Sequence, residues 1–196
     1  MIVFFDVGAH DGRDGFNALG GKYDKCYAFE IDKRMISVIK KTMSVHGENY
    51  VLTEKAVGSE SGKMTFKSYK KTNVGSLYNV DSESVRGREA DFEIVDEYEV
   101  EVITLADFCK ENNIEKIDHL HIDTQGHDFE VIKGLGDYIQ IVEAGVLECY
   151  DDKQQNLYSN TTNTLENCRE YLESAGFSCE FTKQSKHDGN LVFKKL

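Results

Sequence analysis

The sequence predicts an α/β fold with a mostly parallel seven-stranded sheet, helices on both faces and an antiparallel hairpin at the C-terminal end. Short apolar runs alternate with segments of helical period along most of the chain, which is typical of βαβ units. A turn punctuated by glycines follows the first apolar run directly, and a hairpin signal separates the last two. The length of 196 residues is that of one domain, so we expect residues 1–196 to form a single domain.

Seven apolar runs have the length and the bounding residues of strands. They are Ile2–Phe5, Cys26–Glu30, Tyr50–Thr53, His119–Ile122, Gly145–Cys149, Cys179–Thr182 and Leu191–Phe193. The first five alternate with helical segments, so we expect them to be parallel. Between the last two stands His187-Asp188-Gly189-Asn190, which predicts the turn of an antiparallel hairpin.

Three segments between these runs have the period and the end signals of helices. They are Lys33–Val45, Leu105–Glu111 and Leu165–Ala175. The second begins after Thr104, and an acidic residue three positions later makes a variant of the capping box. The third ends at Gly176, which is a typical helix stop.

The middle of the chain predicts a small inserted β element within about residues 62–103. Apolar and polar side chains alternate along Lys63–Tyr69, and Tyr98–Ile103 reads as a partner strand. Between them lies Asp81–Glu97, which is rich in charge. Its composition predicts a solvated loop, and a mobile cover over the substrate is the functional alternative.

Composition excludes several classes of function. The net charge of −12 argues against a nucleic-acid partner, whose phosphates the chain would repel. The five cysteines are odd in number and lack C-x-x-C spacing, which favours reduced thiols in a core. The opening apolar run ends at Asp6 and is too short for a signal peptide or a membrane span. We therefore expect a soluble cytoplasmic protein without membrane partners.

The turn Phe5-Asp6-Val7-Gly8-Ala9-His10-Asp11-Gly12 indicates a nucleoside-containing cofactor. Two glycines four apart let the backbone pass close to a ligand, and the following helix presents unpaired N–H groups to it. Glu30 lies eighteen residues past Gly12, at the end of the next strand, where a carboxylate can accept hydrogen bonds from a ribose diol. The cofactor is therefore expected across the carboxyl edge of the sheet.

The turn lacks the second glycine of a dinucleotide-binding motif, which favours S-adenosylmethionine over a dinucleotide. A dinucleotide fingerprint needs G-x-G-x-x-G, and His10 occupies the position of its second glycine. Asp6 and Asp11 would repel a pyrophosphate but attract the cationic sulfonium and amino group of S-adenosylmethionine. A nicotinamide-dependent oxidoreductase is accordingly disfavoured.

A second motif, Ile117–Leu135, carries a resemblance to a known family. It reads I-D-H-L-H-I-D-T-Q-G-H-D-F-E-V-I-K-G-L, a strand followed by a polar turn and a helix. With the opening turn it resembles the FkbM family of S-adenosylmethionine-dependent methyltransferases, whose segment typically reads L-K-I-D-x-E-G-x-E-x-x-V-L-x-G. The resemblance extends from Phe5 to about Phe177. His121 stands where lysine is usual, and Gln125 stands where glutamate is usual.

The resemblance implies a class I, Rossmann-like methyltransferase that transfers a methyl group to a hydroxyl. Family members resembling this chain methylate sugars, glycans or polyketides, so a hydroxyl of a sugar or glycan is the expected acceptor. Another small-molecule hydroxyl and a non-catalytic module that keeps the cofactor fold are the alternatives. The chain, which starts on its first strand, is expected to be a minimal enzyme or part of a longer protein with glycosyltransferase modules.

Methyl transfer to a hydroxyl requires a group that removes its proton. The expected candidates lie at the carboxyl ends of the central strands. They are Asp123, which matches the family aspartate, then His10 and His127, and Glu148 as a group that orients the substrate. A turn histidine often caps a helix or binds backbone, so a structural role for both histidines stays open.

The expected cofactor contacts follow from the fold that the resemblance implies. Asp6, Gly8, Asp11 and Gly12 would hold the methionine portion, Glu30 and Ile31 the ribose and adenine, and Ala56 and Val57 the edge of the adenine. His10 and Asp123 are further expected cofactor contacts.

Acidic residues near the same edge also allow a divalent metal. Asp123, Asp128, Glu148, Asp151 and Asp152 could assemble an oxygen-ligand site for Mg²⁺ or Ca²⁺. Such an ion would lower the pKa of a bound hydroxyl. Carboxylates at sheet edges are common without a metal, and the sequence leaves the question open.

Overall fold

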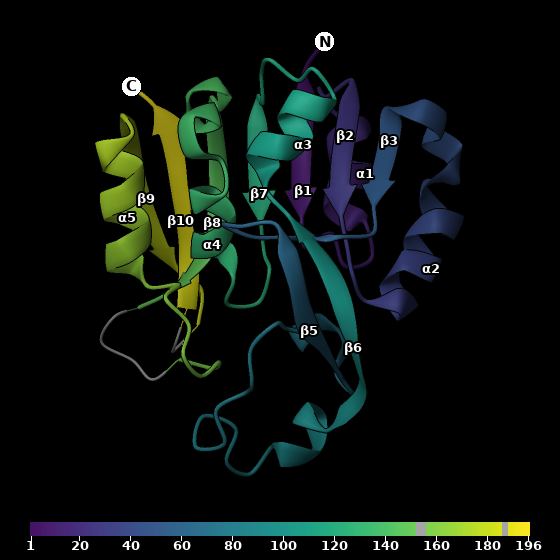
Figure 1. The fold of residues 1–196 in the computed structure, drawn as a ribbon, viewed down its shortest axis with the longest axis vertical. Coiled ribbons are helices and arrows are strands. Elements are labelled where there is room, and N and C mark those ends of the chain that lie inside the picture. Colours follow the sequence, from purple (N-terminus) through teal and green to yellow (C-terminus); the bar gives the residue numbers. More distant parts are fainter. Residues whose placement is uncertain (152–155, 186–187) are drawn as a thin grey trace.

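The computed structural model describes residues 1–151, 156–185 and 188–196, and it has the predicted α/β architecture (Figure 1). A seven-stranded sheet has the strand order β3-β2-β1-β7-β8-β10-β9. Strands β3, β2, β1, β7 and β8 are parallel, and β10 is antiparallel to both β8 and β9. The bounds are β1 Val3–Val7, β2 Lys25–Phe29, β3 Tyr50–Thr53, β7 His119–Ile122, β8 Ala144–Tyr150, β9 Phe177–Lys183 and β10 Asp188–Lys195.

Helices cover both faces of this sheet, and β1 accordingly contributes apolar side chains to a core on each face. Phe5 belongs to the larger core, under α3, α4 and α5, and Phe4 belongs to the smaller core, under α1 and α2. The α-helices are α1 Arg13–Leu19, α2 Lys33–Thr42, α3 Leu105–Glu111, α4 Asp128–Lys133 and α5 Leu165–Ser174. Short 3₁₀ helices are η1 Met43–Asn49, η2 Thr72–Val74, η3 Glu89–Phe92 and η4 Gly136–Ile141.

Helix ends agree with the sequence where a cap determines them. The side chain of Thr104 accepts a hydrogen bond from the Asp107 amide at 3.0 Å, so α3 begins where predicted. Helix α2 is shorter than predicted. It ends at Thr42, and the chain tightens into η1, where Gly47 has a φ of +55° and turns toward β3.

The C-terminal hairpin is confirmed, but three of the four residues predicted as its turn belong to a strand. Asp188, Gly189 and Asn190 belong to β10, and His187 lies outside the described residues. A Cβ on Gly189 would lie 2.6 Å from the Phe181 ring and from a backbone oxygen of β9. This glycine therefore serves close packing between the two strands.

The inserted element is a three-stranded sheet of order β4-β6-β5 that lies beyond the carboxyl edge of the main sheet (Figure 1). Its strands are β4 Ala56–Val57, β5 Gly62–Tyr69 and β6 Ile94–Ile103. The prediction of a loop over Asp81–Glu97 is wrong in part, because η3 forms and β6 begins at Ile94. The Asp81 amide donates to the Leu157 carbonyl at 2.8 Å, which ties the insertion to the segment after β8.

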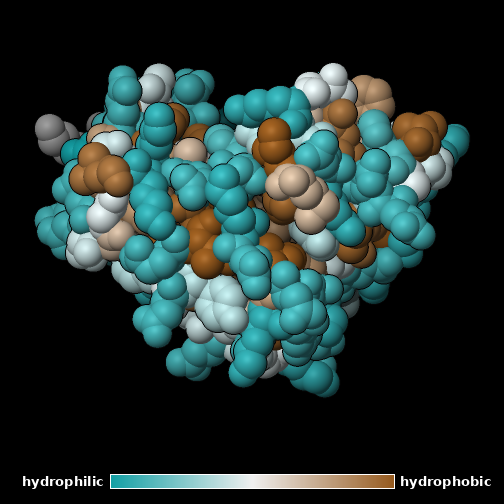
Figure 2. All heavy atoms as spheres, turned by 90° about the horizontal axis from the view of Figure 1, so that it is seen from above, coloured by the Kyte–Doolittle hydropathy of each residue, from teal (hydrophilic) through white to brown (hydrophobic). Residues whose placement is uncertain are grey.

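The end of the molecule opposite the insertion is dominated by hydrophilic residues, with hydrophobic ones showing in patches between them (Figure 2). Charged residues make up 30% of the chain, so such a surface is expected. No helix within the described part of the chain combines the length and apolarity needed to cross a membrane.

Gly145→Ala should destabilise the fold by about 1–3 kcal/mol, the usual cost of overpacking a core. The added Cβ would lie 2.4 Å from both the Leu120 carbonyl oxygen and the Phe193 ring. Gly62→Ala is the matched control, because a Cβ at that strand position meets nothing within 4 Å. Urea unfolding followed by far-UV circular dichroism measures both. Equal stabilities of the two variants would contradict this packing.

Candidate functional site

A cavity of about 430 Å³ lies at the carboxyl ends of β1, β2 and β7, beneath the inserted element. This volume is typical of small-molecule sites. Its lining includes nine of the residues that the sequence predicted for the site: Gly8, His10, Asp11, Glu30, Ile31, Ala56, Val57, Asp123 and His127. Three other predicted residues, Asp6, Gly12 and Glu148, lie outside that lining.

The turn after β1 joins three strands. Gly8 has a φ of +87°, and a Cβ there would lie 1.9 Å from the Asp123 carbonyl oxygen. Only glycine lets the turns after β1 and β7 approach so closely. The Gly8 amide donates to the Phe29 carbonyl at 3.0 Å, and the His10 amide donates to Glu30 Oε2 at 2.6 Å. The turn therefore holds β1 against both of its neighbours.

The Glu30 carboxylate is positioned by three backbone donors. Its Oε1 accepts from the amides of Ile31 and Asp32, each at 2.7 Å, and its Oε2 accepts from His10. A carboxylate has about four acceptor sites, so one remains on Oε2 for a ligand hydroxyl. Burial raises the pKa of Glu30 to about 7, although the backbone donors oppose that shift. This donor set fits a ribose hydroxyl.

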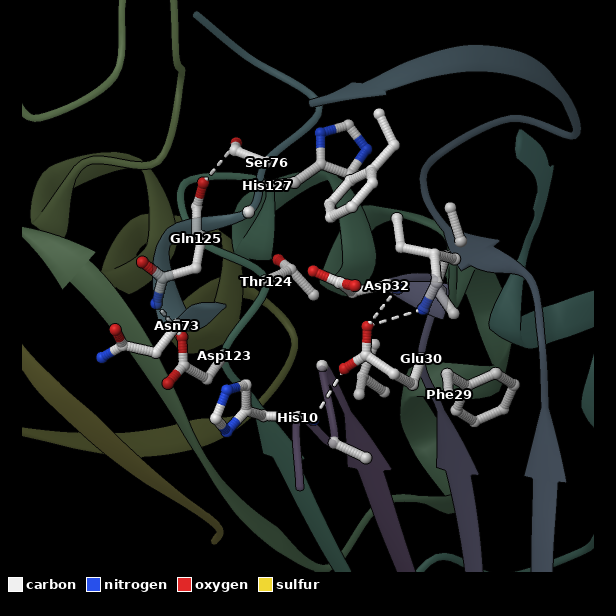
Figure 3. A pocket seen from close by; sticks show the side chains of 18 of the residues that line it. His10, Phe29, Glu30, Asp32, Asn73, Ser76, Asp123, Thr124, Gln125 and His127 are labelled. Carbon is white, nitrogen blue, oxygen red and sulfur yellow. Dashed lines mark hydrogen bonds between the residues drawn. The ribbon is translucent and has the colours of Figure 1, made fainter. Parts of the chain in front are cut away.

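Apolar side chains line the cavity beside Glu30. They are Phe29 at the end of β2, Phe66 within β5, Val57 in β4 and Ile31 in the turn after β2. Figure 3 shows the Phe29 ring next to Glu30. A flat, largely apolar ring such as adenine suits these walls. The two features together fit the adenosyl portion of S-adenosylmethionine.

Asp6 lies beneath the turn rather than in the cavity lining. Its carboxylate is fully buried, accepts from the Gly15 amide at 3.1 Å and lies 2.9 Å from His121 Nδ1. Burial lowers the pKa of His121, but the hydrogen bond to Asp6 outweighs it and raises the pKa to about 9. His121 lines the cavity as an imidazolium at neutral pH, so the position where the family has lysine keeps a cation.

Two predicted proton acceptors face the cavity in different states. Asp123 Oδ1 accepts from Gln125 Nε2 at 2.5 Å, and burial raises the pKa of Asp123 against that hydrogen bond and the charge of His121. His127 Nδ1 lies 3.1 Å from the Tyr78 hydroxyl, and burial lowers the pKa of His127 to about 4. His127 is therefore neutral and weakly basic at physiological pH.

The predicted residues Gly12 and Glu148 lie outside the cavity lining. Gly12 has a φ of +78° and precedes α1 as its N-cap residue. Burial, with the charges of Asp123 and Asp128, raises the pKa of Glu148 to about 9. Within residues 1–151, 156–185 and 188–196, no three His, Cys, Asp or Glu side chains come together to hold a metal ion. The expected ligand Asp152 lies outside those residues.

The inserted element contributes cavity residues that the sequence analysis did not identify. His10 Nε2 lies 3.2 Å from the Thr72 hydroxyl, and Ser76 Oγ donates to the Gln125 carbonyl at 2.7 Å. Figure 3 shows Asn73 beside Asp123 and Gln125. Residues 72–77, rather than the charged segment 81–97, cover this end. The prediction of an insertion was the only signal that could have indicated them.

Comparison with known families gives a match over most of the chain. The model of the family described as "Methyltransferase FkbM domain" matches residues 6–179, a range that includes the turns after β1 and β7. No curated protein sequence matches this chain.

Solved methyltransferase structures share the fold. A methyltransferase FkbM from Methylobacillus flagellatus KT superposes with a TM-score of 0.64 at 12% identity, over 98% of this chain and 43% of that chain. TrmK from M. capricolum, in complex with S-adenosylhomocysteine, gives 0.54 at 12% identity over 99% and 62%. An rRNA methylase from Streptococcus thermophilus gives 0.54 at 12% identity over 100% and 87%. The present chain thus spans less than half of the FkbM structure, and these identities establish the fold alone.

His121→Gln should remove a stabilisation that depends on pH. Because the folded-state pKa of about 9 exceeds the ordinary value of 6.5, the Asp6–His121 pair stabilises fully below pH 6.5 and loses this effect as pH rises through 9. The difference in unfolding free energy between wild type and variant should be on the order of 2–3 kcal/mol at pH 6 and should vanish near pH 10.

His119→Gln is the matched control for this measurement by urea unfolding. Burial lowers the pKa of His119, on the same face of β7. Its protonation in the unfolded chain therefore opposes folding at low pH, and the difference between wild type and this variant should change with pH in the opposite direction. Parallel pH profiles for the two variants would refute the ion pair.

Proposed function

This chain belongs to the FkbM methyltransferase domain family, and on that premise we propose that it transfers a methyl group from S-adenosylmethionine to a hydroxyl of a sugar or glycan. The observation that carries the proposal is the cavity itself. One end has a positioned carboxylate and apolar walls, and the other end has the half-buried carboxyl group of Asp123 near the imidazolium of His121. These surroundings suit the nucleoside and the reactive end of one elongated cofactor.

The chain's own residues divide into binding and proton-accepting roles. Glu30 accepts from the ribose, while Ile31, Val57 and Phe66 surround the adenine. S-Adenosylmethionine, when bound, supplies an electrophilic methyl group and leaves as a neutral thioether, so the acceptor proton is the one that the protein must remove. Asp123 is the proposed base for that proton.

The pKa and the hydrogen bonds of Asp123 favour it over the two histidines as the base. Burial raises its pKa above the usual range of a carboxyl group, and Gln125 is the one described side chain that donates to it, at Oδ1. Burial lowers the pKa of His127 to about 4, which makes it a weak base at neutral pH. His10 has its Nε2 against Thr72 and serves better to hold the cover in place.

The acceptor is proposed to be a carbohydrate because polar side chains of the insertion cover the cavity near Asp123. Thr72, Asn73 and Ser76 offer hydroxyl and amide groups of the kind that bind sugar hydroxyls. The net charge of −12 opposes an RNA substrate, although one solved structure of this fold is an rRNA methylase. Four of the five cysteine thiols are buried, which favours a reducing compartment such as the cytoplasm.

Glu30→Ala should weaken binding of S-adenosylhomocysteine roughly 10- to 150-fold, because a charge-assisted hydrogen bond contributes about 1.5–3 kcal/mol. Isothermal calorimetry measures the affinity, and the exposed Glu48→Ala variant is the control. Wild-type affinity should also fall as pH drops below about 7, where Glu30 takes up a proton. Unchanged affinity in a folded Glu30→Ala protein would remove this residue from the site.

Methyl transfer should be detectable as a mass increase of one methyl group on a carbohydrate. A panel of unmethylated glycans and sugars is incubated with the protein and S-adenosylmethionine, beside phenols, polyketide alcohols and transfer RNA. Asp123→Asn should lower kcat by about 10²–10⁴, the usual contribution of a general base. Parallel reactions with EDTA and with added Mg²⁺ report metal dependence. Methylation confined to the RNA or to the other alcohols would replace the carbohydrate proposal, and no transfer despite cofactor binding would indicate a binding module.

A further inference from the structure

Gln125 connects the proposed base to a buried tyrosine. Its Nε2 donates to Asp123 Oδ1 at 2.5 Å, and its Oε1 accepts from the Tyr158 hydroxyl at 3.1 Å. Figure 3 shows the Gln125 amide pointing at the Asp123 carboxylate. Because Gln125 stands where the family motif has glutamate, this amide donor is a property of the present chain.

Tyr158 determines which end of the amide faces Asp123. The tyrosine is 2% exposed, and burial raises its pKa well above 10, so the hydroxyl keeps its hydrogen. That hydrogen is shared between Gln125 Oε1 and the Val74 carbonyl at 2.9 Å. With the amide oxygen held by a donor, the amide nitrogen must face the carboxylate.

The turn is shaped to receive the Tyr158 ring. Gly126 has a φ of +96°, and a Cβ there would lie 2.9 Å from Tyr158 Cδ2. Any other residue would push the ring away from the turn after β7. The packing therefore fixes the distance between the Tyr158 hydroxyl and Gln125.

The consequence for Asp123 is a carboxyl group with one oxygen occupied. Gln125 takes Oδ1, so Oδ2 is the oxygen available to a ligand. A glutamate at position 125 would also accept from Tyr158, and its second oxygen would need a shared proton to lie against Asp123. The amide removes that need.

Asp123 follows β7, and Glu30 follows β2, with β1 between them in the sheet. Two strand spacings separate them by about 10 Å. A cofactor whose ribose lies at Glu30 therefore extends toward Asp123 with its cationic end.

We propose that Gln125 and Tyr158 are positioning residues that hold Asp123 Oδ1 and direct its Oδ2 at the sulfonium centre of the cofactor. The proposal rests on the proposed function. It assigns to Tyr158, which lies 35 residues beyond Asp123 in the sequence, a role in cofactor selectivity through Gln125.

Two cofactor analogues test this without an acceptor. S-Adenosylhomocysteine is neutral at sulfur, whereas sinefungin carries an ammonium group in place of the methyl sulfonium. Calorimetry should show that wild type prefers sinefungin. Gln125→Met should reduce that preference about tenfold, the value of one charge-assisted hydrogen bond, while the affinity for S-adenosylhomocysteine stays within about twofold. Tyr158→Phe should reduce the preference about threefold to tenfold.

A double-mutant cycle separates positioning from general stability. If Tyr158 acts through Gln125, adding Tyr158→Phe to Gln125→Met should change the preference no further. Tyr69→Phe, another buried tyrosine whose hydroxyl bonds to the insertion, is the matched control and should keep the wild-type preference. Thermal melts establish that each variant is folded.

The outcomes distinguish the two proposals. Failure of both analogues to bind wild type would overturn the proposed function. Binding of both analogues with an unchanged preference in Gln125→Met and Tyr158→Phe would overturn the positioning role and leave the proposed function standing. An additive loss in the double variant would also overturn the role, because Tyr158 would then act independently of Gln125.

Discussion

The buried carboxylate of Asp6 is the group on which the arrangement of the site depends. A fully buried charge must be paired and hydrogen-bonded, and here the partners come from α1 and β7. The Gly15 amide and His121 Nδ1 therefore have to meet beside β1. The contact with Gly15 positions the start of α1, and the contact with His121 places its imidazolium at the cavity wall. Helix position and site charge thus follow from one desolvated side chain.

The inserted element completes the cavity that the sheet alone leaves open. Three contacts hold its cover: His10 with Thr72, Ser76 with the Gln125 carbonyl, and Tyr158 with the Val74 carbonyl. Two of them lie beside the turn after β7, where the proposed base is located. A cover held there excludes water from a site in which charges act strongly. The cover contacts Gln125 and Tyr158, the two residues that we propose to position Asp123.

Much of the fold could be predicted from the sequence because the patterns that indicate strands and helices depend on residues close together in the chain. The bounds of β3, β7 and α3 are those predicted, since alternation and a Thr104 cap need only neighbouring residues. The segment 81–97 was less accessible. Its charge suggested a solvated loop, but Ile94 pairs with β5, more than twenty residues away in the sequence. The residues of the charged segment do not alternate in a way that would indicate pairing with a strand so far away in the sequence.

For the candidate site, local sequence patterns placed Glu30 and Asp123 after strands expected to be parallel, and therefore at one edge of the sheet, and the family motif marked the turn after β7. The packing of distant elements set the rest: Asp6 faces inward, Gly8 makes room for the Asp123 carbonyl after β7, and residues 72–77 form the cover. The reason is physical. Backbone period is set by adjacent residues, whereas the partner of a buried polar group is set by whichever element packs against it. Tyr158 is an example, because no residue near it in the sequence indicates that its hydroxyl donates to Gln125.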